Sequence, residues 1–272
     1  MIASKNGGES FAGRMSQVRF ALRSISLAAI LSVAVLSPAA ARDISFSGRS
    51  WAVTAGPMDD PAAPNRFSGD VRSVWVDGGG RLHLRVRRNA QTWDSAEIAC
   101  SRPLGYGTYS FALETDVGAL DPNVVIGLFT WSDDDAFADR EIDIEFSRWG
   151  DPAAADAQFA IQPYALRGHL VRFNVPRGIR RSTYSFRWEP ASVAFAGYAA
   201  AILSAAVPPP GDARVHINIW LAGARAPIDR REAELVVDRF NFTAMDAFIV
   251  GGQATLAHNV VPTFMVGQGG TR

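Results

Sequence analysis

Three carboxylates stand at alternate positions in one short stretch of the sequence: Glu141, Asp143 and Glu145. Each is followed by an isoleucine or a phenylalanine. Because successive side chains of a β-strand point to opposite faces, the three acids would share one face and the apolar residues would enter the core. Neighbouring like charges repel one another and raise the pKa of a carboxyl group, so folding alone does not favour this arrangement.

Such crowding is useful for the hydrolysis of a glycosidic bond. An enzyme that retains the anomeric configuration needs one ionised carboxylate as nucleophile and one protonated carboxyl group as acid/base. The Cα atoms of Glu141 and Glu145 would lie about 13 Å apart along a strand, whereas retention needs carboxyl groups about 5–5.5 Å apart. The motif therefore predicts a concave sheet on which the two side chains lean toward each other.

Two other interpretations fit the same motif. The stretch can be the solvated face of an acidic strand, or it can bind a cation, because Ca²⁺ and Mg²⁺ prefer carboxylate oxygens. Asp133, Asp134 and Asp135, just upstream, are expected to form a hydrated loop tip. The sequence has no glycine-rich phosphate loop, no zinc-ligand spacing and no Gly-x-Ser-x-Gly elbow.

Short alternating or β-branched segments dominate the rest of the chain, and turn residues such as Asp77-Gly78-Gly79-Gly80 separate them. No stretch shows a long helical period. Many short strands with regular turns indicate an all-β sandwich or barrel. We expect strands at residues 81–87, 106–114, 124–131, 182–188, 215–221 and 234–242.

Composition sets broad limits on the protein. The chain has 272 residues and a formal net charge of zero, which fits one ordinary domain and gives no basic surface for nucleic acid. We expect a monomer. Cys100 is the only cysteine, so no intrachain disulfide can form, and we expect it to be a small buried apolar residue.

The N-terminus has the pattern of a secretory leader. Arginines precede an apolar stretch at residues 25–36, and small residues follow it up to Ala41. We predict cleavage after Ala41 and a secreted or periplasmic protein, with translation starting at Met1 or Met15. An uncleaved anchor is the alternative, although about a dozen apolar residues are short for a span of roughly 20. The domain is predicted at residues 42–247 and a C-terminal tail at 248–272.

Several further segments extend the pattern around the three carboxylates. These segments and the three carboxylates resemble glycoside hydrolase family 16, the jelly-roll glucanases that include lichenases and laminarinases, and they occur in the same order as in that family. The resemblance covers about Asn65 to Phe242. Its segments are Trp93-Asp94-Ser95-Ala96-Glu97-Ile98, Tyr106-Gly107-Thr108-Tyr109, Gly127-Leu128-Phe129-Thr130-Trp131, Tyr184-Ser185-Phe186-Arg187-Trp188-Glu189-Pro190, His216-Ile217-Asn218-Ile219-Trp220-Leu221 and Val236-Val237-Asp238-Arg239-Phe240.

The resemblance implies a two-sheet antiparallel β-sandwich, a concanavalin A-like jelly roll with a cleft across its concave face. It implies that Glu141 is the nucleophile, Glu145 the acid/base and Asp143 the helper that tunes the nucleophile. A single residue separates Asp143 from Glu145, as in the regular-strand form of the motif. The predicted substrate-binding residues are Glu97, Trp131, Trp149, Gln158, Gln162 and Trp220.

Two departures from the family affect the substrate more than the catalysis. Ala99 stands where lichenases tend to place an arginine, and Ala160 where they tend to place an asparagine. The expected function is a retaining endo-β-glycosidase acting on a β-glucan-type polysaccharide, without a cofactor. Asp238 matches a strand that helps to hold a structural Ca²⁺ in some relatives. The alternatives are a transglycosylase using the same three acids and a carbohydrate-binding protein without catalysis.

Overall fold

The computed structural model describes residues 42–57, 64–134, 140–245, 247–250 and 253–256. The predicted leader at residues 1–41 lies outside this range, so it remains a prediction. Within the described range, no helix is long and apolar enough to cross a membrane.

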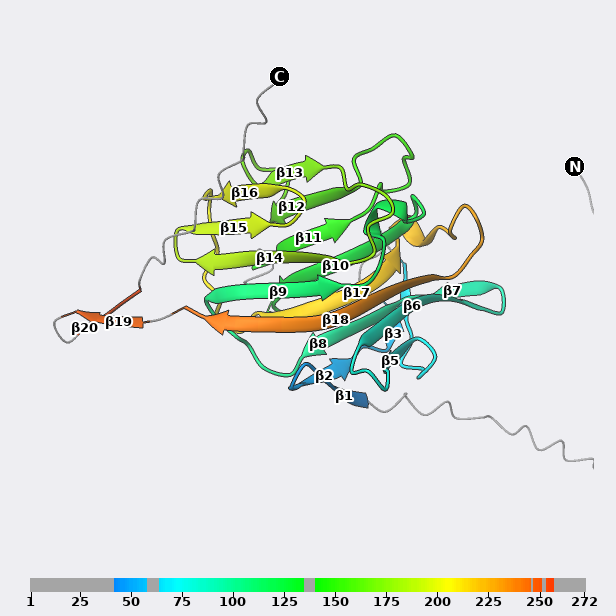
Figure 1. The fold of residues 1–272 in the computed structure, drawn as a ribbon, viewed down its shortest axis with the longest axis horizontal. Coiled ribbons are helices and arrows are strands. Elements are labelled where there is room, and N and C mark those ends of the chain that lie inside the picture. Colours follow the sequence, from blue (N-terminus) through cyan, green and yellow to red (C-terminus); the bar gives the residue numbers. More distant parts are fainter. Residues whose placement is uncertain (1–41, 58–63, 135–139, 246, 251–252, 257–272) are drawn as a thin grey trace, which may run out of the picture. The chain divides into compact units, whose positions relative to one another are not determined.

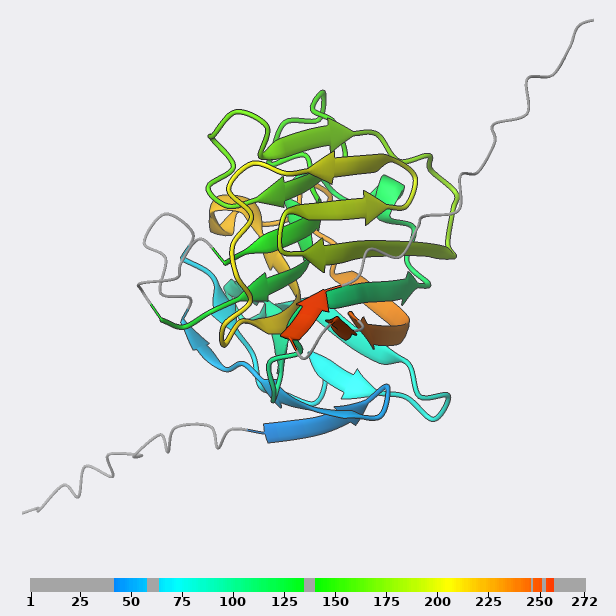
Figure 2. The ribbon, with the colours of Figure 1, turned by 90° about the vertical axis from the view of Figure 1, so that its left-hand side faces the viewer.

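Two eight-stranded antiparallel sheets form the body of the protein, and Figures 1 and 2 show them stacked as two layers. The first sheet has the order β1 (Arg42–Phe46), β2 (Arg49–Val53), β8 (Ala96–Cys100), β17 (Arg214–Leu221), β10 (Val124–Trp131), β11 (Ile142–Phe146), β12 (Ala157–Ile161) and β13 (Leu170–Phe173). The second has the order β16 (Ala200–Leu203), β15 (Ser192–Ala196), β14 (Ser182–Glu189), β9 (Gly107–Leu113), β18 (Ala233–Ala244), β6 (Leu82–Asn89) and β5 (Val74–Val76), and β7 (Thr92–Asp94) pairs with β6. The predicted β-sandwich is confirmed.

All six predicted strands are present, with ends within two residues of those expected. The first sheet differs from the second in its sequence pattern. Strand β6 alternates, and its Leu82, Leu84 and Val86 are buried while the residues between them are partly exposed. Strand β10 is instead apolar at nearly every position and buried along seven of its eight residues. A strand with one solvated face alternates, whereas a strand shielded from water on both faces does not, so the side chains of β10 are shielded on both faces.

Aromatic side chains join the two sheets. The ring of Phe159 on β12 stacks on Phe195 of β15 at a centroid distance of 4.8 Å, and Phe146 on β11 meets Tyr184 of β14 edge-on at 4.7 Å. All four side chains are buried. These contacts hold the strand that carries the three carboxylates firmly against the opposite sheet.

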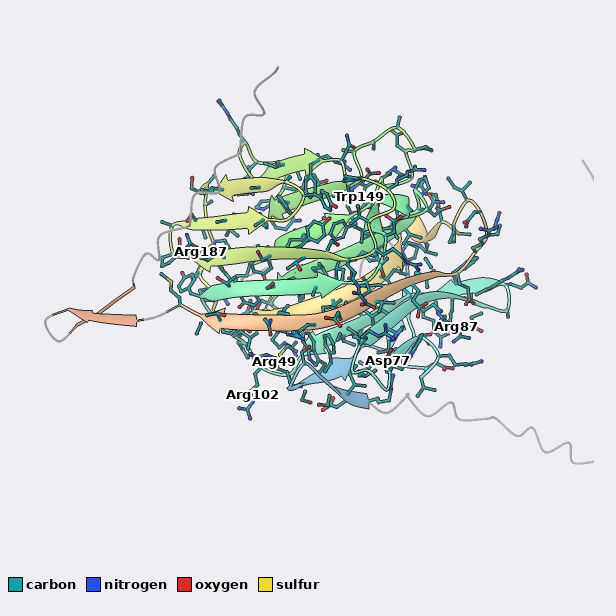
Figure 3. The ribbon with its side chains drawn as sticks, viewed as in Figure 1. Arg49, Asp77, Arg87, Arg102, Trp149 and Arg187 are labelled. Atoms are coloured by element: carbon teal, nitrogen blue, oxygen red, sulfur yellow. The ribbon has the colours of Figure 1, made fainter. Side chains whose placement is uncertain are left out.

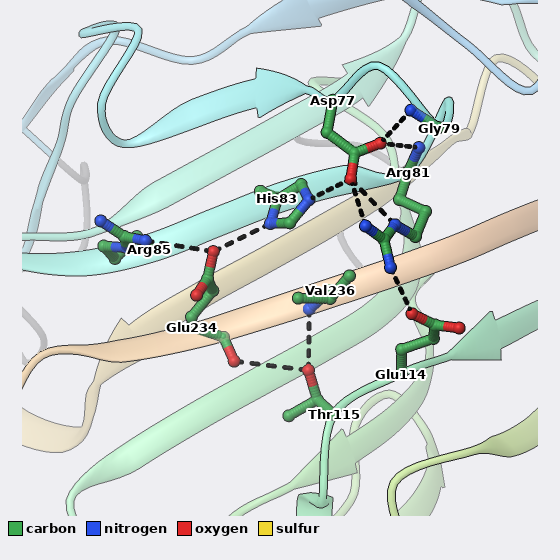
Figure 4. A network of polar contacts seen from close by, with 9 residues as sticks. All are labelled: Asp77, Gly79, Arg81, His83, Arg85, Glu114, Thr115, Glu234 and Val236. Atoms are coloured by element: carbon green, nitrogen blue, oxygen red, sulfur yellow. Dashed lines mark hydrogen bonds and ion pairs between the residues drawn. The ribbon is translucent and has the colours of Figure 1, made fainter.

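An ionic network ties together the outer face of the second sheet at one edge (Figure 4). Asp77, after β5, accepts bonds from His83 and Arg81, and Glu234 on β18 bonds the other ring nitrogen of His83 at 2.9 Å. Arg81 also reaches Glu114 at 2.8 Å. The network links β6 and β18 to the ends of β5 and β9.

The remaining elements are short. Strands β3 (Gly56–Pro57) and β4 (Arg66–Phe67) pair with each other, as do β19 (Ala247–Val250) and β20 (Gln253–Leu256). The helices of the described residues include two 3-10 turns, Val117–Ala119 and Ala222–Ala224. Cys100 is a buried free thiol, as expected.

The packing of the core predicts how much stability is lost when one buried aromatic ring is removed. Phe186 on β14 is fully buried and lies 4.6 Å from Tyr109 between ring centroids. Phe186→Ala should lower the free energy of unfolding by about 3–5 kcal/mol in urea denaturation. Ile202→Ala, at a side chain that is 71% exposed, is the control and should change it by less than about 0.5 kcal/mol. Equal effects of the two variants would contradict the assigned core.

Candidate active site

The register of the first sheet places the three carboxylates on the face opposite the core. Ile142 and Ile144 on β11 belong to the buried apolar cluster between the sheets, so the side chains between them point the other way. Asp143 pairs with Phe129 of β10, and Glu145 pairs with Gly127. Residues directly opposite each other in a sheet share a face. We refer to this side of the first sheet as the carboxylate face.

Each carboxylate has a specific polar neighbour. Gln158 of β12 donates from Nε2 to Glu145 Oε2 at 2.6 Å, and Gln162 donates from Nε2 to Asp143 Oδ2 at 3.0 Å. Glu141 and Asp143 are hydrogen-bonded to each other through their side chains. Asp143 is only 1% exposed. The structure therefore brings together all three predicted catalytic residues and two of the predicted binding residues.

Burial and mutual repulsion shift the titration of all three groups in one direction. Burial raises the pKa of Glu141 to about 8, and the charges of Glu145 and Glu97 add to this effect. Burial also raises the pKa of Glu145 to about 8, with a contribution from the charge of Asp143. The pKa of Asp143 lies well above its ordinary value, because of burial first and the charge of Glu141 second. Near neutral pH the cluster therefore retains protons and titrates as a unit.

The hydrogen bond between Glu141 and Asp143 requires a proton on one of the two carboxyl groups, because ionised carboxylates only accept. The pair therefore holds at least one proton while this bond is formed.

Glu97, on β8, is the fourth acid of the carboxylate face, and its surroundings differ. It accepts hydrogen bonds from Thr54 at 2.9 Å and from Asn218 at 3.1 Å, and it lies 3.4 Å from Nδ1 of His216. Burial alone acts to raise the pKa of Glu97, but bonding to His216, Asn218 and Thr54 outweighs burial and the pKa is lowered. Glu97 is therefore a fixed anion beside the three protonatable acids.

His216 and Asn218 are site residues that the sequence analysis did not single out. Both are more than nine-tenths buried. His216 Nε2 and Asn218 Oδ1 have no hydrogen-bond partner among the described residues. Their spacing of two on β17 places them on one face together with Trp220. That alternation, read beside the carboxylate motif, was the signal that could have identified them.

Gly127 leaves room for this side-chain arrangement. It pairs with Glu145 on one side and with Asn218 on the other. A Cβ atom at this position would lie 2.6 Å from Asn218 Oδ1, which is closer than real contacts allow. The glycine therefore lets the amide of Asn218 lie across β10 between Glu97 and Glu145.

The three predicted tryptophans lie toward two ends of the carboxylate face. Trp131 is the last residue of β10, and Trp220 pairs with Val125 near the start of that strand. Six residues of strand separate these positions by about 20 Å. Trp149, labelled in Figure 3, packs edge-on against Trp220 with ring centroids 5.8 Å apart. It reaches this place from a turn in which its φ is +53°.

Other acidic residues do not join the carboxylates. Asp133 and Asp134 are exposed, and Asp133 pairs with Arg214, while Asp135 lies outside the described residues. Asp238 is exposed at a bulge of β18. Among the described residues, no group of three or more His, Cys, Asp or Glu side chains has the arrangement of a metal site.

Comparisons with solved structures agree with this architecture. A β-glucanase of Bacillus licheniformis superposes with a TM-score of 0.56 at 17% identity, over 71% of this chain and 91% of that chain. A lichenase (a prokaryotic β-1,3-1,4-glucanase) from a mouse hindgut metagenome gives 0.53 at 18% identity, over 71% and 91%. An immunostimulatory antigen and pseudo β-1,3-glucanase of Mycobacterium tuberculosis gives 0.55 at 18% identity, also over 71% and 91%. No family model and no curated protein matches the sequence. At these identities the likeness establishes the fold, a jelly-roll sandwich like that of the β-glucanases.

The raised pKa of Glu145 predicts how stability depends on pH. Its pKa is about 8 in the folded protein and about 4.5 in the unfolded chain. The folded state binds this proton more tightly, so ionisation destabilises it progressively from pH 4.5 to 8. Glu145→Gln cannot ionise at this position. Its free energy of unfolding should exceed that of the wild type by about 2–4 kcal/mol at pH 8.5, and the difference should shrink toward pH 5. A difference independent of pH, measured by urea denaturation, would contradict the assignment.

Proposed function

We propose that this protein is a glycoside hydrolase that cleaves a β-glucan-type polysaccharide with retention of configuration. The observation that carries the proposal is the cluster of Glu141, Asp143 and Glu145 on one face of the first sheet, in which burial raises every pKa and the hydrogen bond between Glu141 and Asp143 requires a shared proton. A reaction that needs one carboxylate and one carboxylic acid side by side at neutral pH requires a cluster that retains some of its protons. The names of the fold neighbours, β-glucanase and lichenase, support the substrate class.

In the proposed reaction, an oxygen of Glu141 attacks the anomeric carbon while the glycosidic bond breaks. Glu145, protonated because its pKa is about 8, gives its proton to the departing oxygen. The sugar is then bound covalently to Glu141. Glu145, now ionised, takes a proton from a water molecule, whose oxygen attacks the same carbon and releases Glu141. Asp143 stays hydrogen-bonded to Glu141 throughout and tunes its charge.

The other polar groups of the carboxylate face suit the binding of sugar hydroxyls. Glu97 is a buried anion, and Gln158 and Gln162 hold the orientation of Glu145 and Asp143 through their amides. The paired rings of Trp149 and Trp220 and the ring of Trp131 offer flat apolar surfaces toward the ends of the face. We assign these six residues to substrate binding, on sugar rings that span the distance between the tryptophans. No cofactor enters the proposed chemistry.

A binding protein without catalysis is the second candidate, because one fold neighbour is named a pseudo β-1,3-glucanase. The three raised pKa values favour the enzyme, since a binding surface gains nothing from repelling carboxylates. A transglycosylase would use the same first step and differ only in the acceptor.

We propose that the protein is exported, on the basis of the basic, apolar and small-residue pattern of residues 1–41. We also propose that it is a monomer.

Glu141→Gln tests the nucleophile. Release of reducing sugar should be measured on soluble β-1,3-, β-1,4- and mixed-linkage glucans and on galactan. The wild type should act on at least one polymer, and the variant should be slower by about 10³-fold or more, because a neutral amide cannot form the covalent intermediate. Glu232→Gln, at an exposed acid just before β18 of the other sheet, is the matched control and should remain active. Equal rates for wild type and Glu141→Gln would overturn the assignment.

Glu145→Ala tests the acid/base. With an activated aryl glycoside the first step needs little proton donation, so the covalent intermediate should form and then hydrolyse slowly. Azide is a strong nucleophile that needs no general base. It should therefore restore turnover by about 10-fold or more and yield a glycosyl azide with the configuration of the substrate. Mass spectrometry and NMR of the product check this. A product of opposite configuration would instead indicate that the enzyme inverts.

A further inference from the structure

Glu141 lies just outside the regular ladder of the first sheet. The pairing of β10 with β11 ends at Phe129 and Asp143, and β11 itself starts at Ile142. On the β12 side, the carbonyl of Glu141 accepts a hydrogen bond from the backbone of Gln162 at 3.0 Å. On the β10 side, the ladder does not reach it. Another contact must therefore fix the backbone of Glu141 on that side.

The side chain of Thr130 makes that contact. Its hydroxyl donates to the carbonyl of Arg140 at 3.0 Å and accepts from the backbone N–H of Ile142 at 3.2 Å. One buried hydroxyl thus bonds the peptide groups on both sides of Glu141. Thr130 is fully buried, so water cannot replace it without a rearrangement. The hydroxyl takes the place of the ladder bonds that the strand lacks here.

The side chain of Arg140 anchors the same segment to a distant loop. Its Nη1 lies 2.9 Å from Oδ1 of Asp212, which also accepts a bond from Ser132 at 2.7 Å. Next to it, Gly211 has a φ of +48°, and a Cβ atom there would collide with the guanidinium of Arg140. The ion pair of Arg140 with Asp212 therefore fixes the residue that precedes Glu141 in the chain.

We propose that Thr130 is a positioning residue for Glu141, supported by the ion pair of Arg140 with Asp212. This inference rests on the proposed function, because the position of Glu141 matters only if Glu141 is the nucleophile. A nucleophile must approach the anomeric carbon within a few tenths of an ångström of its productive place, and a displacement of about 1 Å can cost 10²-fold in rate. Thr130 sets the backbone from which the Glu141 side chain starts.

The test compares two nearly isosteric changes at one position. Thr130→Val retains the shape of threonine and loses the hydroxyl, whereas Thr130→Ser retains the hydroxyl. Thr130→Val should lower kcat by about 10- to 100-fold with a change in KM of less than about threefold, and Thr130→Ser should keep kcat within about fivefold of the wild type. Rates are measured on the most active polymer, at a temperature where circular dichroism shows every variant folded.

Two further measurements separate positioning from general damage. Binding of cello-, laminari- and mixed-linkage tetrasaccharides is compared for Glu141→Gln alone and combined with Thr130→Val, and the affinities should agree within about threefold. Asp212→Ala, at a 59% exposed side chain, removes the ion pair between Arg140 and Asp212 without opening a cavity and should lower kcat in the same direction; it carries the test if Thr130→Val fails to fold. Unchanged kcat in the folded variants of an active enzyme would overturn this inference alone. A wild type inactive on every polymer would overturn the proposed function and this inference with it.

Discussion

The burial of three carboxyl groups, on β11 and on the residue just before it, is the constraint on which the site depends. Glu141, Asp143 and Glu145 would each be more stable in water, and burial is the largest cause of every raised pKa among them. The sandwich compensates for this unfavourable burial, because aromatic packing on the core side and pairing with β10 and β12 hold β11 in place. A loop could not hold three repelling groups in contact. A strand at the centre of a packed sheet can.

Some neighbours of the cluster orient a carboxyl group, and others fix its charge. Gln158 and Gln162 are neutral donors, so they orient Glu145 and Asp143 without cancelling the repulsion that keeps the protons bound. Glu97 is the opposite case, since the bonds from His216, Asn218 and Thr54 keep it ionised. Four acids on one face thus fall into two classes, and in each case the class follows from the partner and not from the residue type.

The sequence predicted what depends on local periodicity. Alternation placed Asp143 and Glu145 on one face, and turn residues marked the six main strands within two residues. It could not predict the partners of Glu97, because Asn218 lies 121 residues away in the chain and only the order of strands in the sheet brings them together. The contact of Trp149 with Trp220 could not be predicted from alternation either, because a backbone with positive φ turns Trp149 toward that ring. The bond of Thr130 across the end of the ladder is likewise invisible in the sequence.

The central claim, that the carboxylate face holds protonated acids at neutral pH, can be tested without a substrate. Glutamate labelled with ¹³C at the side-chain carboxyl carbon allows each group to be titrated by NMR, and Glu141→Gln and Glu145→Gln assign the two resonances. We expect the Glu145 resonance to titrate well above the ordinary range, near pH 8, and Glu141 to be the first of the two to ionise. If both titrated below about pH 5, as exposed glutamates do, the cluster would be fully ionised at neutral pH. Glu145 could then not act as the acid.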